Sequence, residues 1–288
     1  MTLIMGCRSL DRGIAARSEI LRLVPDSKTS IEVWEIDMAS YDSVKRLAHR
    51  VSTELSRLDT LIANAGISTN DFAIAEDLEQ SLTVNVVSTF LLGLLCAPKL
   101  NETAERTGKQ SHLVIVGSVV HAFADHRQIM SESNVNIFDS LSDEKTADME
   151  GRYYLSKLLV ILCVQEMAEQ MRRGSSSSTT RWNGSSIILT CASPGGCKTQ
   201  LFRTNDGGLV GRNMLRLIGR SAEVGSRTLV SAATMDASAH GHYLADGRIK
   251  DASVWVRSKE GAQAQRRVWK DLVDVLEKIS PGILSKIP

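Results

Sequence analysis

The sequence predicts an α/β fold in which a doubly wound parallel sheet carries helices on both faces. Short apolar runs of strand type alternate with longer segments in which apolar residues recur at helical spacing. Parallel neighbouring strands need such long crossovers, because the chain must return along the sheet before it can pair again. No internal repeat and no shift of composition divides the 288 residues, so we expect a single domain.

The first half of the chain alternates strands and helices. Short apolar runs, and an alternation of apolar residues over Ile31–Ile36, indicate strands. Ser40 is of a type favoured at the N-cap of the helix that follows it. In chain order we expect a strand at Thr2–Met5, a helix at Asp11–Leu23, a strand over Ile31–Ile36, a helix from Ser40 through Val51, a strand at Leu58–Ala63, a long apolar helix at Glu76–Leu100 and a strand at Leu113–Val116.

The second half continues the alternation after an irregular stretch. A serine-rich segment is expected to be a surface loop, because its composition favours flexible chain. In order we expect an irregular stretch at Ala122–Met149, a helix at Arg152–Arg173, the serine-rich loop at Gly174–Ser186, a strand at Ile187–Thr190, a glycine-containing loop at Ser193–Gly208, helices at Leu209–Ile218 and Ala222–Met235, a strand at His242–Leu244 and a helix at Gly261–Ile279.

Charge and composition favour a small or neutral partner. The 34 basic and 33 acidic residues leave a net charge of +1 without a long block of one sign, which argues against nucleic acid and against an anionic membrane surface. The longest apolar stretch, Val84–Ala97, contains polar residues and is shorter than the roughly 20 residues of a membrane span. We therefore expect a buried helix, no membrane span and a cytoplasmic protein.

Cysteine and histidine placement indicates neither a disulfide framework nor a metal site. The 5 cysteines lie far apart without a CxxC pair, which is typical of reduced intracellular thiols. The 6 histidines are scattered, and His240 with His242 has the spacing of a strand face rather than of a helical metal pair.

The string RYYLSKL carries the most informative chemistry. Tyr153 and Lys157 are four residues apart at the start of a predicted helix and therefore share one face. A phenol is a poor acid or base at neutral pH, but a nearby ammonium stabilises the phenolate and lowers the pKa of the tyrosine. Ser118 follows the predicted strand Leu113–Val116, at the sheet edge where ligands approach. The three side chains can together handle a carbonyl or alcohol oxygen and its proton.

In this order Ser118, Tyr153 and Lys157 resemble the catalytic set of the short-chain dehydrogenase/reductase family, and further strings extend the resemblance over almost the whole chain. Asn85 in LTVNVVST matches the family's helix asparagine, which the resemblance places in a proton relay with Tyr153, Lys157 and water. The alternative for Asn85 is a satisfied polar group in a buried helix.

Two other strings resemble cofactor-binding segments of that family. In LDTLIANAGI, the residues Asn64, Ala65 and Gly66 match the segment beside the adenosine end of the cofactor, although Asn64 and Gly66 can also serve turn geometry alone. SPGGCKT resembles the segment that holds the nicotinamide carboxamide, with Cys197 where valine or isoleucine is usual. The residues implied there are Pro194, Gly195, Cys197 and Thr199.

The beginning of the chain favours NADP(H) over NAD(H). Arg8 follows the first predicted strand, and a guanidinium there can bind the adenosine 2′-phosphate in a bidentate manner, whereas an NAD site places an acid at such a strand end. By resemblance Asp37 hydrogen-bonds the adenine amino group. The alternatives are a solvated charge for Arg8 and a helix-capping role for Asp37.

The glycine-rich turn of such a site is missing from the sequence. In the family a strand, the pattern TGxxxGxG and a helix precede the strand that ends at Arg8, and that first strand lies at the centre of the sheet. We therefore expect a Rossmann-like sheet without its first strand-turn-helix, with residues 1–110 an incomplete nucleotide-binding half and residues 111–288 a catalytic and substrate half. Either the given sequence lacks an N-terminal segment, or the chain binds cofactor poorly or not at all.

Together these observations predict an NADP(H)-dependent oxidoreductase that interconverts a carbonyl and a secondary alcohol. The apolar residues of Ala122–Met149 and Leu201–Leu209 are expected to form the substrate pocket and lid, which favours an apolar small molecule. The chain looks most like retinol-dehydrogenase-like members and fungal secondary-metabolism reductases. The competing class is a non-catalytic relative that acts as a subunit partner or scaffold, and a homodimer is one possible assembly. The apolar residues concerned are Phe123, Ile129, Met130, Ile137, Phe138, Leu201 and Phe202.

Overall fold

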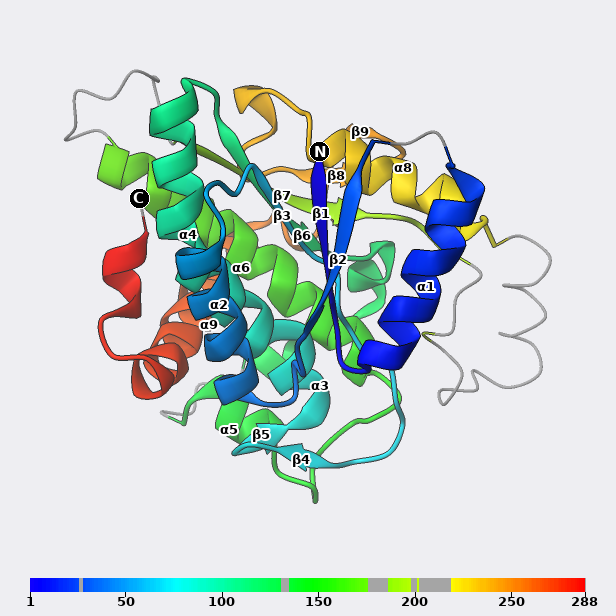
Figure 1. Ribbon diagram of the computed structural model, residues 1–288. Coiled ribbons are helices and arrows are strands. Elements are labelled where there is room, and N and C mark those ends of the chain that lie inside the picture. Colours follow the sequence, from blue (N-terminus) through cyan, green and yellow to red (C-terminus); the bar gives the residue numbers. More distant parts are fainter. Residues whose placement is uncertain (26–27, 131–134, 176–185, 198–200, 202–218, 288) are drawn as a thin grey trace.

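The computed structural model describes residues 1–25, 28–130, 135–175, 186–197, 201 and 219–287. Parallel strands lie at the centre of these residues and helices flank them, so the predicted α/β class is confirmed (Figure 1). The predicted helix Leu209–Ile218 and nearly all of the serine-rich loop lie outside the described residues.

The larger sheet has the strand order β3-β6-β7-β8-β9. Four of its strands run parallel and β9 is antiparallel to β8. Every residue of β7 is buried, which explains its continuous apolar run, because a central parallel strand is covered on both faces. The strands are β3 (Thr60–Ala63), β6 (Ser111–Val116), β7 (Ile187–Ser193), β8 (Tyr243–Ala245) and β9 (Arg248–Lys250).

A smaller sheet contains the first two strands. β1 (Thr2–Cys7) pairs in parallel with β2 (Ser30–Glu35), with Cys7 opposite Glu35. Among the described residues no strand is hydrogen-bonded between β1 and β3, the position at which the resemblance implies a further central strand. Leu3 on β1 and Ile62 on β3 accordingly remain 39% and 37% exposed.

Helices α1 and α2 begin at the serine caps that precede them. Ser9 accepts the N–H of Arg12 at the start of α1 (Leu10–Leu23), and Ser40 accepts the N–H of Ser43 at the start of α2 (Tyr41–Glu54). The second cap confirms the predicted start of that helix. Helix α2 buries an apolar stripe against α4, whereas most apolar side chains of α1 remain partly exposed.

One long helical segment, Gln80–Thr107, consists of α3 (Gln80–Leu82), the π-helical turn η1 (Thr83–Val87) and α4 (Ser88–Thr107). Its predicted start at Glu76 was wrong, because β4 (Ile74–Ala75) and β5 (Leu78–Glu79) form a short hairpin there. The whole segment has 28 residues and by length and composition could cross a membrane, although the apolar run Val84–Ala97 within it is shorter than a membrane span. Burial supports the core helix instead, because 89% of its most apolar window lies inside the fold.

The C-terminal helices cover the long central helices. Helix α9 (Lys259–Ile279) packs against α6 (Arg152–Ser175), and the 3₁₀ turn η6 (Ile283–Lys286) packs against α4. Helix α8 (Ala222–Ala232) lies against β7 and the short turn η5 (Ala237–Ala239) follows it. These positions confirm the predicted helices near Arg152, Ala222 and Gly261.

The stretch predicted as irregular, Ala122–Met149, contains helical turns. They are η2 (Val119–Phe123), η3 (His126–Ile129) and α5 (Ile137–Leu141). Ile129, Ile137 and Phe138 are at most 3% exposed and belong to the main hydrophobic core. Ile137 and Phe138 lie on α5, which packs against α9 and β5. The prediction that these residues line a substrate pocket was therefore wrong.

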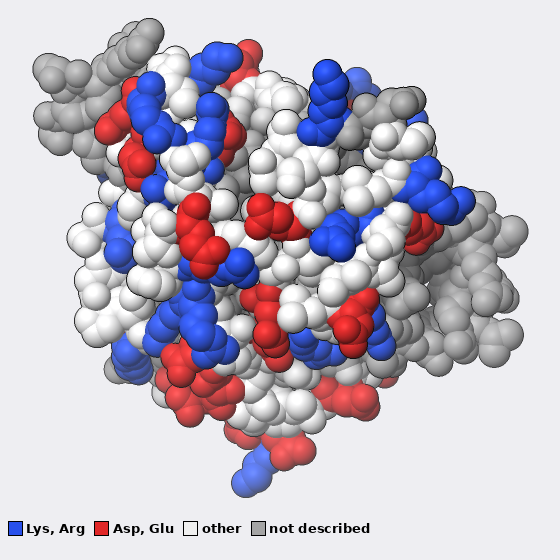
Figure 2. Space-filling view, in the orientation of Figure 1, with Lys and Arg blue, Asp and Glu red and all other residues white. Residues whose placement is uncertain are grey.

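The charged side chains show no large patch of one sign on the face shown in Figure 2, where basic and acidic residues are interspersed. The balanced formal charge of +1 is therefore also balanced locally over this face.

Candidate active site

Ser118 lies just beyond the carboxyl end of β6, where the strand gives way to η2. Its backbone is extended, and its Oγ accepts the N–H of Val120 at 3.4 Å. Gly117, between strand and serine, packs against β7, since a Cβ there would lie 2.5 Å from Sγ of Cys191. The close approach of the two strands thus places Ser118 at the sheet edge where the sequence predicted it.

Tyr153 lies on the first turn of α6 and reaches Ser118. Its side chain is 5% exposed, and its phenol is hydrogen-bonded to the side chain of Ser118. Burial raises the pKa of Tyr153 to about 12, and the Ser118 hydrogen bond opposes this shift. The phenol therefore keeps its proton at neutral pH in this structure.

Lys157 lies one turn further along α6 and is also buried. Its Nζ donates a hydrogen bond of 2.8 Å to the carbonyl oxygen of Val116 and lies 5.8 Å from the ring centroid of Tyr153. Burial lowers the pKa of Lys157 to about 8. The expectation that this ammonium lowers the pKa of Tyr153 is not met here, because burial raises the pKa of the phenol and the opposing contribution comes from the Ser118 hydrogen bond.

Asn85 lies in the π-helical turn η1 and is 1% exposed. Its Oδ1 accepts the N–H of Ile67 at 2.8 Å, and its Nδ2 donates to the carbonyl of Ile67 at 2.9 Å and to Oγ of Ser156 at 3.0 Å. Asn85 therefore fastens the segment after β3 to α6. The structure gives it no direct hydrogen bond to Tyr153 or Lys157, and its place in a proton relay stays a prediction.

Comparisons with known proteins give these side chains a family context. A profile of the short chain dehydrogenases matches residues 3–129. The short chain dehydrogenase/reductase dmxR8 of Cryptosporiopsis sp. is 40% identical over 286 residues, which cover 98% of this chain and 85% of the relative. The short-chain dehydrogenase anuD of Penicillium roqueforti is 36% identical over 294 residues, covering 99% of this chain and 74% of the relative. The chain belongs to the short-chain dehydrogenase/reductase family. It is therefore an oxidoreductase by family, and the family binds a nicotinamide cofactor.

Solved structures of short-chain dehydrogenases share this fold. A short-chain dehydrogenase from Sphingobium yanoikuyae in complex with NADPH superposes with a TM-score of 0.53 at 18% identity, covering 80% of this chain and 73% of that one. An uncharacterized protein from Mycobacterium Paratuberculosis superposes with a TM-score of 0.62 at 21% identity, covering 94% and 83%. At these identities the likeness shows the fold alone.

Gly66, which the resemblance places in a cofactor-binding segment, lies close to two of the predicted catalytic side chains. A Cβ on Gly66 would lie 3.2 Å from Oδ1 of Asn85 and 3.6 Å from Nζ of Lys157, so the glycine keeps a small space open beside the buried ammonium. Neither Gly66 nor Asn64 has a positive φ, which removes the turn-geometry alternative that rested on such a φ. Asn64 and Ala65 are exposed directly after β3.

The Pro194–Cys197 segment follows β7 at the same edge of the sheet. Gly195 has a φ of +78°, a conformation that L side chains rarely adopt. Cys197 is partly buried, its Sγ lies 3.4 Å from the carbonyl oxygen of Pro194, and Arg220 donates its N–H to Gly196 at 2.8 Å. These bonds hold the segment that the sequence assigned to the nicotinamide carboxamide. Thr199 lies outside the described residues.

Arg8 and Asp37 lie at one end of the β1–β2 pair. Arg8 is exposed just after β1, and no ion pair joins it to another described residue. The Oδ1 of Asp37 accepts the N–H of Ala39 at 2.9 Å, while Ser40 provides the N-cap of α2. Asp37 thus stabilises the turn before that helix without capping it.

The described residues contain no glycine-rich turn of the kind that receives a diphosphate, so we assign no residue to that group.

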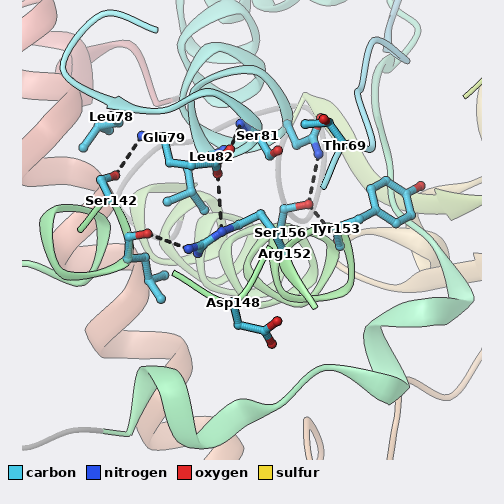
Figure 3. A network of polar contacts seen from close by, with 12 residues as sticks. Thr69, Leu78, Glu79, Ser81, Leu82, Ser142, Asp148, Arg152, Tyr153 and Ser156 are labelled. Carbon is cyan, nitrogen blue, oxygen red and sulfur yellow. Dashed lines mark hydrogen bonds and ion pairs between the residues drawn. The ribbon is translucent and has the colours of Figure 1, made fainter. Parts of the chain in front are cut away.

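Sequence reasoning missed a buried polar network beside Tyr153. Arg152 and Glu79 form an ion pair at 1% and 0% side-chain exposure, and Figure 3 shows it between the β5–α3 segment and the first turn of α6. A second missed residue is His121, which is 4% exposed and bonds the carbonyl of Ser118. For Arg152 and Glu79, the one signal in the sequence was a charged residue beside an apolar helical pattern. Such a signal can indicate a buried charge, but it does not identify a partner far away in the sequence.

Proposed function

We propose that this chain is an NADP(H)-dependent oxidoreductase that interconverts a carbonyl and a secondary alcohol on an apolar small molecule of secondary metabolism. The observation that carries the proposal is the buried phenol of Tyr153, hydrogen-bonded to Ser118 one helical turn from Lys157. A cytoplasmic location is part of the proposal, supported by the balanced charge and the five free cysteines.

The assigned chemistry divides the work between cofactor and protein. The nicotinamide, when bound, supplies or accepts the hydride. Ser118 orients the substrate oxygen with its hydroxyl, and Tyr153 gives that oxygen a proton in reduction and removes it in oxidation. The raised pKa of Tyr153 keeps the phenol protonated at neutral pH, which supports a role as proton donor to a carbonyl.

Lys157 and Asn85 support this proton transfer in different ways. The ammonium of Lys157 has three donors, and the carbonyl of Val116 takes one of them. The others serve the cofactor's ribose and stabilise the phenolate as it forms. Asn85 keeps the segment at Ile67 and the helix at Ser156 at a fixed spacing, which is a precondition for a water held between them.

Exposed apolar side chains beside the catalytic residues support an apolar substrate. Val119 follows Ser118 and is 49% exposed, and Phe123 at the end of η2 is 73% exposed. Tyr154, next to Tyr153, is 37% exposed. These side chains can cover an apolar molecule whose reactive oxygen lies at Ser118, whereas the buried residues of α5 cannot.

The proposal is tested with NADPH, phenanthrenequinone as an apolar carbonyl probe, and a matched pair of variants. We expect the protein to quench or enhance NADPH fluorescence on binding and to oxidise NADPH when the quinone is present. Tyr153→Phe should lower turnover by about a hundredfold or more, since general acid catalysis contributes roughly that much. Tyr154→Phe, which removes a hydroxyl from the neighbouring exposed ring, should leave turnover within about twofold.

Two outcomes would refute this function. Full turnover by Tyr153→Phe would refute the assigned mechanism. Absence of NADPH binding by folded protein would favour the alternative class, a non-catalytic relative that acts as a subunit partner. Sedimentation of the same sample measures whether such a protein, or the enzyme, forms a homodimer.

A further inference from the structure

We propose that Arg152 is a positioning residue that fixes the Tyr153 phenol on Ser118 through its buried ion pair with Glu79. The inference rests on the proposed function, in which Tyr153 transfers the proton. Arg152 directly precedes Tyr153 in the first turn of α6, and Glu79 directly precedes the helical segment that carries Asn85. The pair therefore joins the starts of the two helices that contribute to the site (Figure 3).

Glu79 is fixed by its backbone and by both carboxylate oxygens. Its Oε1 accepts the N–H of Ser81 at 2.7 Å and its Oε2 accepts the N–H of Leu82 at 3.2 Å, so the side chain caps α3. Its own N–H donates to Oγ of Ser142 at 2.8 Å. The side chain of Glu79 has no exposed surface, so its carboxylate is held in one position and a partner charge can approach it only from within the protein.

Arg152 uses its guanidinium to join three segments. Nε lies 3.4 Å from Oε2 of Glu79, and Nη2 donates a hydrogen bond of 2.6 Å to the carbonyl oxygen of Leu141 at the end of α5. Nε and Nη1 have no hydrogen-bond partner among the described residues. Burial lowers the pKa of Arg152, while Glu79 and Asp148 oppose this shift. A buried guanidinium with so few hydrogen bonds is a poor source of net stability.

Because the guanidinium of Arg152 is buried but makes few hydrogen bonds, its ion pair with Glu79 is better explained by a geometric role than by a gain in stability. Replacing a buried ion pair by apolar residues of similar volume is often neutral or stabilising, so stability alone does not account for the pair. A second link lies one turn along α6, where Asn85 donates to Ser156 and Ser156 donates to the carbonyl of Tyr153 at 2.8 Å. One link is made at Arg152 and the other at Ser156, so they lie on opposite sides of Tyr153 along the helix. Together they fix the rotation and the axial position of the first turn of α6.

The test compares removal of one charge with removal of both. Arg152→Met leaves Glu79 buried and unpaired and is expected to unfold at a much lower urea concentration. The double variant Glu79→Gln, Arg152→Met removes both charges and should raise the urea midpoint back toward that of the wild type, although one helix-capping bond and the bond to Leu141 stay lost. If Arg152 positions Tyr153, the double variant should still reduce phenanthrenequinone about tenfold more slowly than the wild type, with its KM for NADPH within about twofold.

A readout independent of turnover is the NMR resonance of the Tyr153 ring in protein that contains ring-¹³C tyrosine, assigned by its loss in Tyr153→Phe. In the double variant this resonance should move toward that of an exposed tyrosine, whereas the signals of Tyr41 and Tyr243 should stay in place. Arg172→Met is the matched control, since it breaks an exposed ion pair with Glu169 on the same helix and should change neither readout.

An unmoved Tyr153 resonance in a stable double variant would overturn the positioning role, and unreduced turnover in that variant would do the same. Wild-type protein without turnover would overturn the proposed function instead, while the resonance would still decide whether Arg152 fixes Tyr153. The two failures are therefore distinguishable.

Discussion

Nζ of Lys157 lies 2.8 Å from the carbonyl oxygen of Val116, so the last residue of β6 binds the ammonium of α6 directly. This hydrogen bond ties the helix that carries the proposed proton donor to the strand that leads to Ser118. The bond is made by a fully buried amine whose pKa burial lowers to about 8, so it forms at the cost of desolvating a charge.

Removal of that charge should stabilise the fold. At pH 7 Lys157→Met should raise the free energy of unfolding by about 2 kcal/mol, since the pKa shift corresponds to roughly 3 kcal/mol and the lost bond to Val116 offsets about 1 kcal/mol. Between about pH 8 and pH 10.5 the folded lysine has lost its proton while the unfolded lysine keeps it, so wild-type stability rises with pH in this window.

Urea unfolding of both proteins at pH 7 and pH 9.5 measures the effect. The difference between variant and wild type should shrink at the higher pH, because the variant has no lysine to titrate at this position. A variant that is less stable than the wild type at pH 7 would contradict the lowered pKa. Turnover should be lost in the variant at either pH if Lys157 acts as proposed.

His121 should make the fold sensitive to acid. Its Nδ1 donates to the carbonyl of Ser118 at 2.8 Å and its Nε2 accepts the N–H of Ser253 at 3.0 Å, an assignment in which the ring is neutral. Burial lowers the pKa of His121 below its ordinary value of 6.5. As the pH falls through about 6.5, the unfolded histidine takes up a proton first, so stability decreases.

His121→Gln removes this titration and should flatten the dependence of unfolding free energy on pH between 7 and 5. At pH 7 the variant should be less stable by about 1–3 kcal/mol, because buried backbone groups of Ser118 and Ser253 lose partners. His126→Gln provides a control, since His126 stacks on Trp255 in a more exposed position. Parallel pH curves for wild type and His121→Gln would count against the proposed titration.

The sequence predicted those parts of the site that depend on local pattern. Ser40 caps its helix as expected, Tyr153 and Lys157 lie on α6, and Ser118 follows β6. These positions could be predicted because helical periodicity and strand ends depend on residues that are close together in the sequence. The β4–β5 hairpin was missed because two-residue strands leave no alternation to detect. The direction of the Tyr153 pKa was missed because burial depends on tertiary packing.

Other failures have the same cause. Phe138 was assigned to a pocket because its neighbourhood looked irregular, but Asp271 of α9 accepts the N–H of Ile137 at 2.8 Å and draws this segment into the core. The Glu79–Arg152 pair joins residues far apart in sequence, and nothing in the sequence around either residue indicates the other as its partner. Long-range packing thus decides which polar side chains meet.

Gly225 should be essential for the Pro194–Cys197 segment. A Cβ at this first-turn position of α8 would lie 2.2 Å from Sγ of Cys197 and 3.2 Å from the carbonyl oxygen of Pro194. Gly225→Ala should therefore destabilise the fold by about 1–3 kcal/mol and raise the KM for NADPH, because the segment must shift to relieve the overlap.

The double variant Cys197→Ala, Gly225→Ala removes the sulfur and should recover most of both losses. Cys197→Ala alone is the control and is expected to change stability by about 1 kcal/mol or less, because the thiol is only partly buried. If Gly225→Ala matches the wild type in urea midpoint and in KM for NADPH, the segment does not depend on this contact.

Arg8 should decide the choice between NADPH and NADH. The residue is exposed at the carboxyl end of β1, where it is available to a phosphate on the adenosine side of the cofactor. A hydrogen bond to a charged group contributes about 1.5–3 kcal/mol, so Arg8→Ala should weaken NADPH binding by roughly ten- to a hundredfold and NADH binding by about twofold or less. Raising the ionic strength should weaken wild-type NADPH binding more than that of the variant.

The matched control is Arg22→Ala, which removes an exposed guanidinium from the last turn of α1, at the opposite end of that helix from Arg8. Fluorescence titration of wild type and both variants with each cofactor at one ionic strength supplies the six affinities needed. Because net charge falls equally in the two variants, a loss confined to Arg8→Ala and to NADPH isolates a local phosphate contact. Equal weakening of NADPH and NADH in Arg8→Ala would show instead that the side chain supports the site without recognising the 2′-phosphate.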